Sequence, residues 1–165
     1  MIRLRSSTKT DINLLSHIIR SNSKLYDTII PGAFELYAEK LTRTGIPKSF
    51  STEIIELNEK EVGFLGIKIL NDQVVYLKAL YLDPQYKGQK IGSSVMDQLI
   101  MRYQSLGYSE MVLLVHKDAF WAKKFYEFKG FTGNSCENGF ICQYKNGLLK
   151  NHMISNTILY TYKLT

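Results

Sequence analysis

Residues 74–99, VVYLKALYLDPQYKGQKIGSSVMDQL, join three patterns in succession. The first nine residues are mostly apolar, which predicts a strand inside a sheet. A basic loop follows, and its Gly88 indicates a twisted or closely approached backbone. Ile91, Val95 and Leu99 then recur at helical spacing. A basic loop before a helix start, where backbone N–H groups lack partners, is typical of a phosphate site, although the same lysines could simply be solvated.

The helix that begins in this stretch is followed along the chain by a strand and a second helix. The helix that begins at the glycine loop is predicted to cover residues 91–106. Residues 110–116, EMVLLVH, form a continuous apolar run that is typical of a buried central strand. Residues 118–131, DAFWAKKFYEFKGF, predict another helix. Because a crossover helix between two strands favours parallel pairing, we expect a parallel β-α-β unit at the centre of the chain.

The flanking sequence predicts the remaining helices and strands. Helices are expected over residues 8–26 and 31–45, from apolar residues at helical spacing. Strands are expected over residues 1–7, three times within 51–84, and over 139–147 and 156–165. The predicted fold class is therefore α/β, a three-layer arrangement in which helices flank a mixed, mostly antiparallel sheet with a central parallel β-α-β unit. We expect residues 1–165 to form a single domain.

Composition narrows the classes of protein that fit. The chain has 165 residues, 45% of them hydrophobic and 22% charged, which is ordinary globular composition. No signal peptide or membrane-spanning run is evident, so a soluble, cytoplasmic protein is expected. Cys136 and Cys142 match neither a CxxC pair nor a zinc framework, and the three histidines are scattered, so no metal site is predicted. The net charge of +6 fits an anionic ligand or an acidic partner.

Residues 74–131 resemble the GNAT superfamily of acetyl-CoA-dependent N-acetyltransferases. In the family, the loop reads Arg or Gln, two residues, Gly, one residue, then Gly or Ala; here Lys87-Gly88-Gln89-Lys90-Ile91-Gly92 fills that register. Lys87 keeps a positive charge, whereas Lys90 stands where the family usually has Gly. In the later helix, Ala122, Tyr126 and the Gly130-Phe131 ending match, and Ala119 replaces a frequent Asn.

This resemblance implies an enzyme that transfers acetyl from acetyl-CoA to a primary amine by direct attack. Tyr126 matches the family's general acid, which protonates the thiolate leaving group. The backbone at Leu80, Tyr81 and Leu82 would bind the pantetheine arm and polarise the thioester carbonyl. The other residues implied in binding the cofactor are Lys87, Gly88, Gln89, Lys90, Ile91, Gly92, Ser93 and Ala122.

The general base and the acceptor stay open. Residues 74–82 contain no carboxylate, so His116 is a candidate base because the histidine side chain in general titrates near neutral pH. The other candidates are Glu35, Glu56, Asp118 and a water relay. The acceptor could be a small-molecule amine, a peptide amine or an aminoacyl-tRNA. The resemblance alone also implies a possible homodimer. A non-catalytic CoA-binding or sensing module is the alternative class. No aromatic-basic readout motif supports a nucleic-acid-binding domain.

Overall fold

A computed structural model describes residues 1–134 and 137–165, so Cys136 lies outside the described residues. The chain divides into two compact units, a first unit of Met1–Lys68 and Leu77–Gln98 and a second unit of Ile69–Tyr76 and Leu99–Thr165. The expected single domain stays a prediction. Among the helices of the described chain, none has the length and apolar character needed to cross a membrane. The cytoplasmic location also stays a prediction.

In the described parts of the chain, seven strands form one mixed sheet, in the order β1-β2-β3-β4-β5-β7-β6. Their bounds are β1 Ile2–Ser6, β2 Ser51–Leu57, β3 Lys60–Ile69, β4 Val74–Leu82, β5 Glu110–His116, β6 Thr132–Gly133 and β7 Thr157–Lys163. Strand β4 pairs in parallel with β5, Val74–Tyr76 against Glu110–Val112. The pairs β1–β2, β2–β3, β5–β7 and β6–β7 are antiparallel. The predicted α/β fold with a central parallel unit is confirmed.

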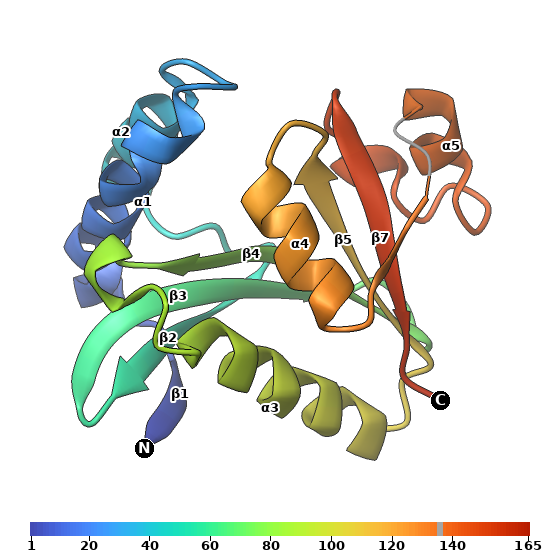
Figure 1. The fold of residues 1–165 in the computed structure, drawn as a ribbon, viewed down its shortest axis with the longest axis horizontal. Coiled ribbons are helices and arrows are strands. Elements are labelled where there is room, and N and C mark those ends of the chain that lie inside the picture. The colour runs from blue at the N-terminus through green and yellow to red at the C-terminus, as the bar shows by residue number, and fades with distance from the viewer. Residues whose placement is uncertain (135–136) are drawn as a thin grey trace. The chain divides into compact units, whose positions relative to one another are not determined.

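Two helices of the first unit, α1 (Ile12–Tyr26) and α2 (Ala33–Thr44), lie side by side (Figure 1). Their apolar faces share one core with Ile54 of β2 and Phe64 of β3. The helical members of that core are Leu15, Ile18, Ile19, Phe34, Ala38 and Leu41. Burial of these side chains, at about 25 cal/mol per Å² of apolar surface, holds the two predicted helices in place.

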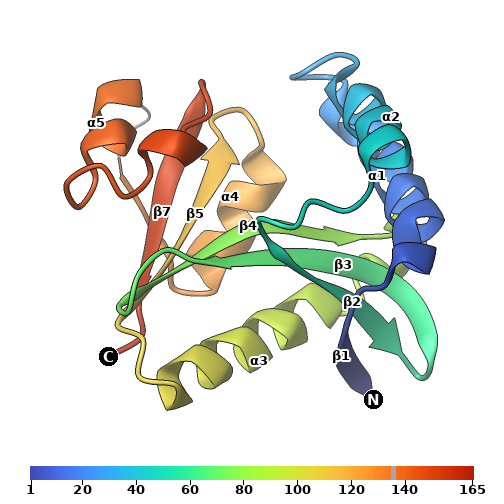
Figure 2. The same ribbon diagram turned by 180° about the vertical axis from the view of Figure 1, so that it is seen from behind.

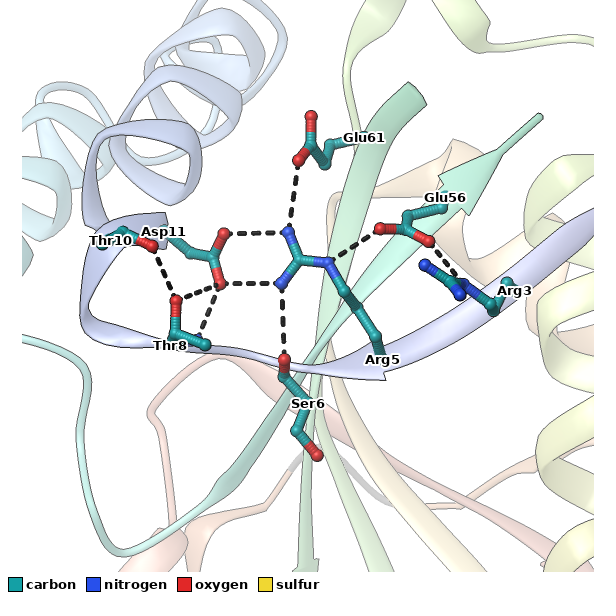
Figure 3. Close-up of polar contacts among 8 residues, drawn as sticks. All are labelled: Arg3, Arg5, Ser6, Thr8, Thr10, Asp11, Glu56 and Glu61. Atoms are coloured by element: carbon teal, nitrogen blue, oxygen red, sulfur yellow. Dashed lines mark hydrogen bonds and ion pairs between the residues drawn. The ribbon is translucent and has the colours of Figure 1, made fainter. Parts of the chain in front are cut away.

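An ion-pair network ties β1 to the chain before α1 (Figure 3). The Arg5 guanidinium donates to both carboxylate oxygens of Asp11, at 2.9 and 3.0 Å, and to Glu56 Oε1 at 2.7 Å. Asp11 also accepts the backbone N–H of Thr8 at 2.7 Å, which closes the 3₁₀ turn η1 (Lys9–Asp11). The hydrogen bond from Arg5 is the main cause that lowers the pKa of Asp11.

The second unit contains β5, α4 (Phe120–Phe128), β6 and β7, and β5 and β7 run side by side (Figure 2). Helix α3 (Ile91–Ser105) begins in the first unit and ends in the second. Tyr160 of β7 donates its hydroxyl to Glu127 of α4 at 2.8 Å. Burial and, secondly, that carboxylate raise the pKa of Tyr160 to about 12. The predicted elements at 91–106, 110–116 and 118–131 are therefore confirmed within a few residues.

The strand predicted over residues 139–147 is wrong. Asn138–Gln143 forms a short helix, α5, and Lys150–His152 forms the 3₁₀ turn η3. Three successive residues, Lys145, Asn146 and Gly147, have φ values of 44°, 61° and 91°, which no strand accommodates. The strand that pairs with β7 on the side away from β5 is instead β6, at Thr132–Gly133.

Candidate functional site

The C-terminal end of β4 is held from both sides within the first unit. The Tyr81 ring packs against Phe34, Phe64 and Tyr26, with centroid distances of 5.5, 5.6 and 6.3 Å. The backbone N–H of Asp83 donates to the carbonyl of Val62 at 2.8 Å. These contacts fix the backbone over Leu80–Leu82, the segment to which the resemblance assigns the thioester.

Gly63 of β3 lies against this same backbone. A Cβ atom at Gly63 would stand 2.8 Å from Leu82 Cδ2 and 3.2 Å from Leu82 Cα, and closer still to the carbonyl oxygen of Tyr81. Carbon atoms in ordinary contact are 3.5–4.0 Å apart. Glycine is therefore the residue that lets β3 approach the end of β4.

A buried asparagine joins β4, the glycine loop and α1. Asn22, 2% exposed, donates through Nδ2 to the carbonyls of Ile18 and Leu82, both at 2.9 Å. Its Oδ1 accepts from Lys87 Nζ at 2.6 Å, and burial lowers the pKa of Lys87. The Lys87 side chain, although exposed over much of its surface, thus ties the loop to α1 through its ammonium group. Nothing in the local sequence pattern distinguishes Asn22, which lies seven residues after Leu15 on the apolar stripe of α1.

The Asp83-Pro84 pair between β4 and the loop stabilises a short turn. Asp83 Oδ1 accepts the backbone N–H of Gln85 at 3.1 Å and thereby caps the 3₁₀ turn η2, Pro84–Tyr86. Its other oxygen, Oδ2, lies 3.2 Å from His17 Nε2 of α1. Proline at the first position of such a turn already has the required φ and needs no N–H partner.

The glycine loop turns twice through the left-handed region before α3. Gly88 has a φ of 78°, and Lys90 has a φ of 60°. The conformation of Lys90 gives a physical reason for glycine at this position in the family, since glycine enters this region without steric cost. The N–H of Ser94 donates to the carbonyl of Lys90 at 3.0 Å, which is a bond of the helical type. The N–H groups of Ile91–Ser93 come before Ser94 and therefore lie in the first turn of α3. Such N–H groups, at the start of a 15-residue helix, can bind an anion.

The second unit carries the residues expected to take part in proton transfer. Tyr126 is half-buried on α4, and its ring makes edge-on contacts with Phe125 and Phe131 at 5.0 and 5.6 Å. Ala122 lies one turn earlier on the same helix. Ala119, 1% exposed, is the N-cap of α4 and offers no side-chain hydrogen bond there.

The candidate bases are largely engaged by other groups. His116, the last residue of β5, accepts the backbone N–H of Asp118 at Nδ1, at 3.2 Å. Glu35 accepts from Arg20 Nε at 2.9 and 3.1 Å, and Glu56 belongs to the Arg5 network. In residues 1–134 and 137–165, no group of three or more His, Cys, Asp or Glu side chains could hold a metal ion.

The α/β fold and the glycine loop at the start of α3 are the features by which this chain can be compared with known proteins. The sequence profile described as the acetyltransferase (GNAT) family matches residues 21–131. The chain therefore belongs to the GNAT acetyltransferase family. No curated protein matches the sequence.

Solved structures share the fold over almost the whole chain. The ribosomal-protein-S18-alanine N-acetyltransferase of Escherichia coli is 18% identical, with a TM-score of 0.68, over 100% of this chain and 95% of that one. The PaiA N-acetyltransferase of Thermoplasma acidophilum, solved with coenzyme A, is 19% identical, with a TM-score of 0.68, over 99% of both chains. A GNAT acetyltransferase of Elizabethkingia anophelis with acetyl-CoA bound is 17% identical, with a TM-score of 0.64, over 98% of this chain and 97% of that one.

Proposed function

We propose that this chain transfers the acetyl group of acetyl-CoA to a primary amine by direct attack of the amine on the thioester. The observation that carries the proposal is the basic loop of Lys87–Lys90, which turns through two left-handed residues into the start of α3. The structures of two relatives of the same fold, one with coenzyme A and one with acetyl-CoA, support acetyl-CoA as the ligand.

The residues of the loop fit a pyrophosphate. In this proposal the backbone N–H groups of Gln89–Ser93 bind its oxygens, and the exposed Lys90 side chain adds a positive charge. Lys87 contributes indirectly, because its bond to Asn22 holds the loop against α1. The backbone at Leu80–Leu82 binds the pantetheine arm and polarises the carbonyl. Bound acetyl-CoA supplies the activated acyl group.

One side chain of the second unit, that of Tyr126, is proposed to transfer the proton that the leaving group needs. Tyr126 donates its phenolic proton to the leaving thiolate, since a tyrosine hydroxyl is neutral near pH 7 and can act as a donor. His116 is poorly placed to act as the base through Nδ1. Its Nδ1 lone pair already accepts the N–H of Asp118, so the neutral ring carries its proton on Nε2. Deprotonation of the amine is then left to water.

Binding and turnover test this proposal separately. Acetyl-CoA should raise the melting temperature, because it binds only the folded state. Tyr126→Phe should lower kcat at least ~10-fold in a thiol-release assay with an amine panel and leave the dissociation constant of acetyl-CoA unchanged. The matched control is Tyr108→Phe, which removes a hydroxyl from another half-buried tyrosine of the second unit. No thermal shift at millimolar acetyl-CoA rejects the ligand, and full turnover of Tyr126→Phe, where chemistry limits the rate, rejects the acid.

A non-catalytic CoA-binding module is the second candidate. Three features favour a non-catalytic module: Lys90 in the loop, Ala119 at the start of α4, and the absence of a carboxylate from β4. It predicts a thermal shift with acetyl-CoA and no thiol release with any amine. An aminoacyl-tRNA acceptor and a homodimer remain predictions from the resemblance.

A further inference from the structure

Two lysines of the first unit lie over one aromatic ring, and a third lysine acts electrostatically on one of them. Lys68 of β3 and Lys78 of β4 place their Nζ atoms 5.6 and 5.7 Å from the ring centroid of Phe50. Lys40 of α2 is close enough to act electrostatically on Lys78. Burial and, secondly, the charge of Lys40 lower the pKa of Lys78. The fold therefore holds like charges together, at an electrostatic cost.

These lysines differ from three arginines of the same unit. Arg3, Arg5 and Arg20 each form an ion pair with a carboxylate. Within the described ranges, 1–134 and 137–165, Lys40, Lys68 and Lys78 have no carboxylate within ion-pair distance. The cluster therefore has unneutralised positive charge, which an anion from outside the chain would balance.

The backbone of β4 aims Lys78 toward this cluster. A Cβ atom at Gly66 of β3 would lie 3.7 Å from the Cβ atoms of both Lys78 and Ala79. Consecutive residues of a regular strand point to opposite faces, so this geometry indicates a bulge that brings both side chains to one face. Ala79 packs against the core formed with α1 and α2. Lys78 therefore emerges on the face of the sheet that carries those helices.

The cluster also lies close to the proposed acetyl-transfer segment. Lys78 is two residues before Leu80 on the same strand. Two residues of extended chain span at most about 7 Å. A small molecule that contacts the Lys78 ammonium could therefore present another of its atoms to the end of β4.

We propose that Lys68 and Lys78, assisted by Lys40, bind the anionic group of the acceptor, so that the substrate is a small amine with a carboxylate or phosphate a few bonds from its nitrogen. This inference rests on the proposed function. The Lys ammonium is a strongly hydrated point charge that suits either anion. The ring of Phe50 favours the positions of both ammonium groups by cation–π attraction.

Equilibrium binding of matched probes tests the inference without turnover. Titration calorimetry compares O-phosphoethanolamine with ethanolamine, and β-alanine with β-alaninamide, with and without CoA. At least one anionic probe should bind at least ~10-fold more tightly than its neutral partner, and added salt should reduce that ratio. Lys78→Met and Lys68→Met, which keep an apolar stem, should each remove most of the preference. The control is Lys60→Met, at the opposite, exposed end of β3.

The outcomes separate the inference from the proposed function. Equal binding of charged and neutral probes, or equal losses in Lys60→Met and Lys78→Met, overturns the anion site. Absence of thiol release with every amine overturns the acetyl-transfer proposal and leaves the binding result standing. The phosphate and carboxylate arms identify which anion the site takes. Melting curves of each variant separate lost binding from lost folding.

Discussion

Replacing Gly63 by alanine perturbs the end of β4 from a neighbouring strand. The new Cβ atom would lie 2.8 Å from Leu82 Cδ2 and nearer still to the Tyr81 carbonyl oxygen. An ordinary contact begins at about 3.5 Å, so these atoms must yield by roughly 0.7 Å or more. The backbone of Tyr81 cannot turn aside as a flexible side chain would, because its ring packs against Phe34 and Phe64.

The size of the effect follows from a matched substitution. Gly66→Ala, on the same buried strand, places its Cβ 3.7 Å from Lys78 and Ala79, an ordinary contact. Both substitutions share the gain of about 0.5–1 kcal/mol from replacing glycine in a strand. Their difference therefore isolates the clash, at about 1–3 kcal/mol of unfolding free energy, or 2–4 °C in Tm for each kcal/mol.

Activity should fall with stability in Gly63→Ala. A displacement approaching 1 Å at the proposed thioester-binding backbone can cost up to ~10²-fold in rate. Urea denaturation of both variants measures the stability difference, and thiol release at a temperature where both are folded measures the rate. If Gly63→Ala is as stable and as active as Gly66→Ala, the close approach of β3 to β4 does not constrain the site.

Two further predictions concern charged residues of the first unit. Lys90→Gly should weaken CoA binding about 5-fold at low salt, which is equivalent to roughly 1 kcal/mol for one exposed phosphate contact. The substitution should not destabilise the fold, because glycine adopts the φ of 60° freely. Tighter binding by calorimetry would mean that Lys90 only crowds the loop. Asp11→Asn should lower the unfolding free energy by about 1–3 kcal/mol at pH 7. Because the bond from Arg5 lowers the folded-state pKa of Asp11 below its ordinary 3.8, this stabilisation is present above that pH and is lost as the pH falls through the folded-state value. Denaturation curves at pH 7, 4 and 3 should show the two proteins converging, and a constant gap would contradict this assignment.

Local pattern alone predicted most of the elements that frame the site. The apolar run of β4, the glycine loop and the periodic start of α3 are contiguous in sequence, so their physics is local. The same holds for β5, whose continuous apolar run matches its burial between β4 and β7. The loop motif led directly to the family that the profile match established.

Residues 139–147 show where local pattern was insufficient. Ile141 is fully buried and Phe140 is 43% exposed, a contrast that an alternating strand would also produce. The left-handed turn at Lys145–Gly147 decides against a strand, and backbone conformation at non-glycine residues is weakly encoded by residue type. The two-residue strand β6 is too short to give any periodic signal.

The polar contacts of the site were decided by tertiary structure. Lys87 meets Asn22 across 65 residues of chain, and Gly63 meets the β4 backbone across a strand pairing. The placement of Lys78 beside Lys68 over the Phe50 ring likewise exists only once β3 and β4 have paired. The sequence by itself determined which segments become helix or strand, because periodic burial of apolar side chains is a property of neighbouring residues. Only the tertiary structure decided which partner each polar or charged side chain contacts, because residues distant in sequence become neighbours only through packing.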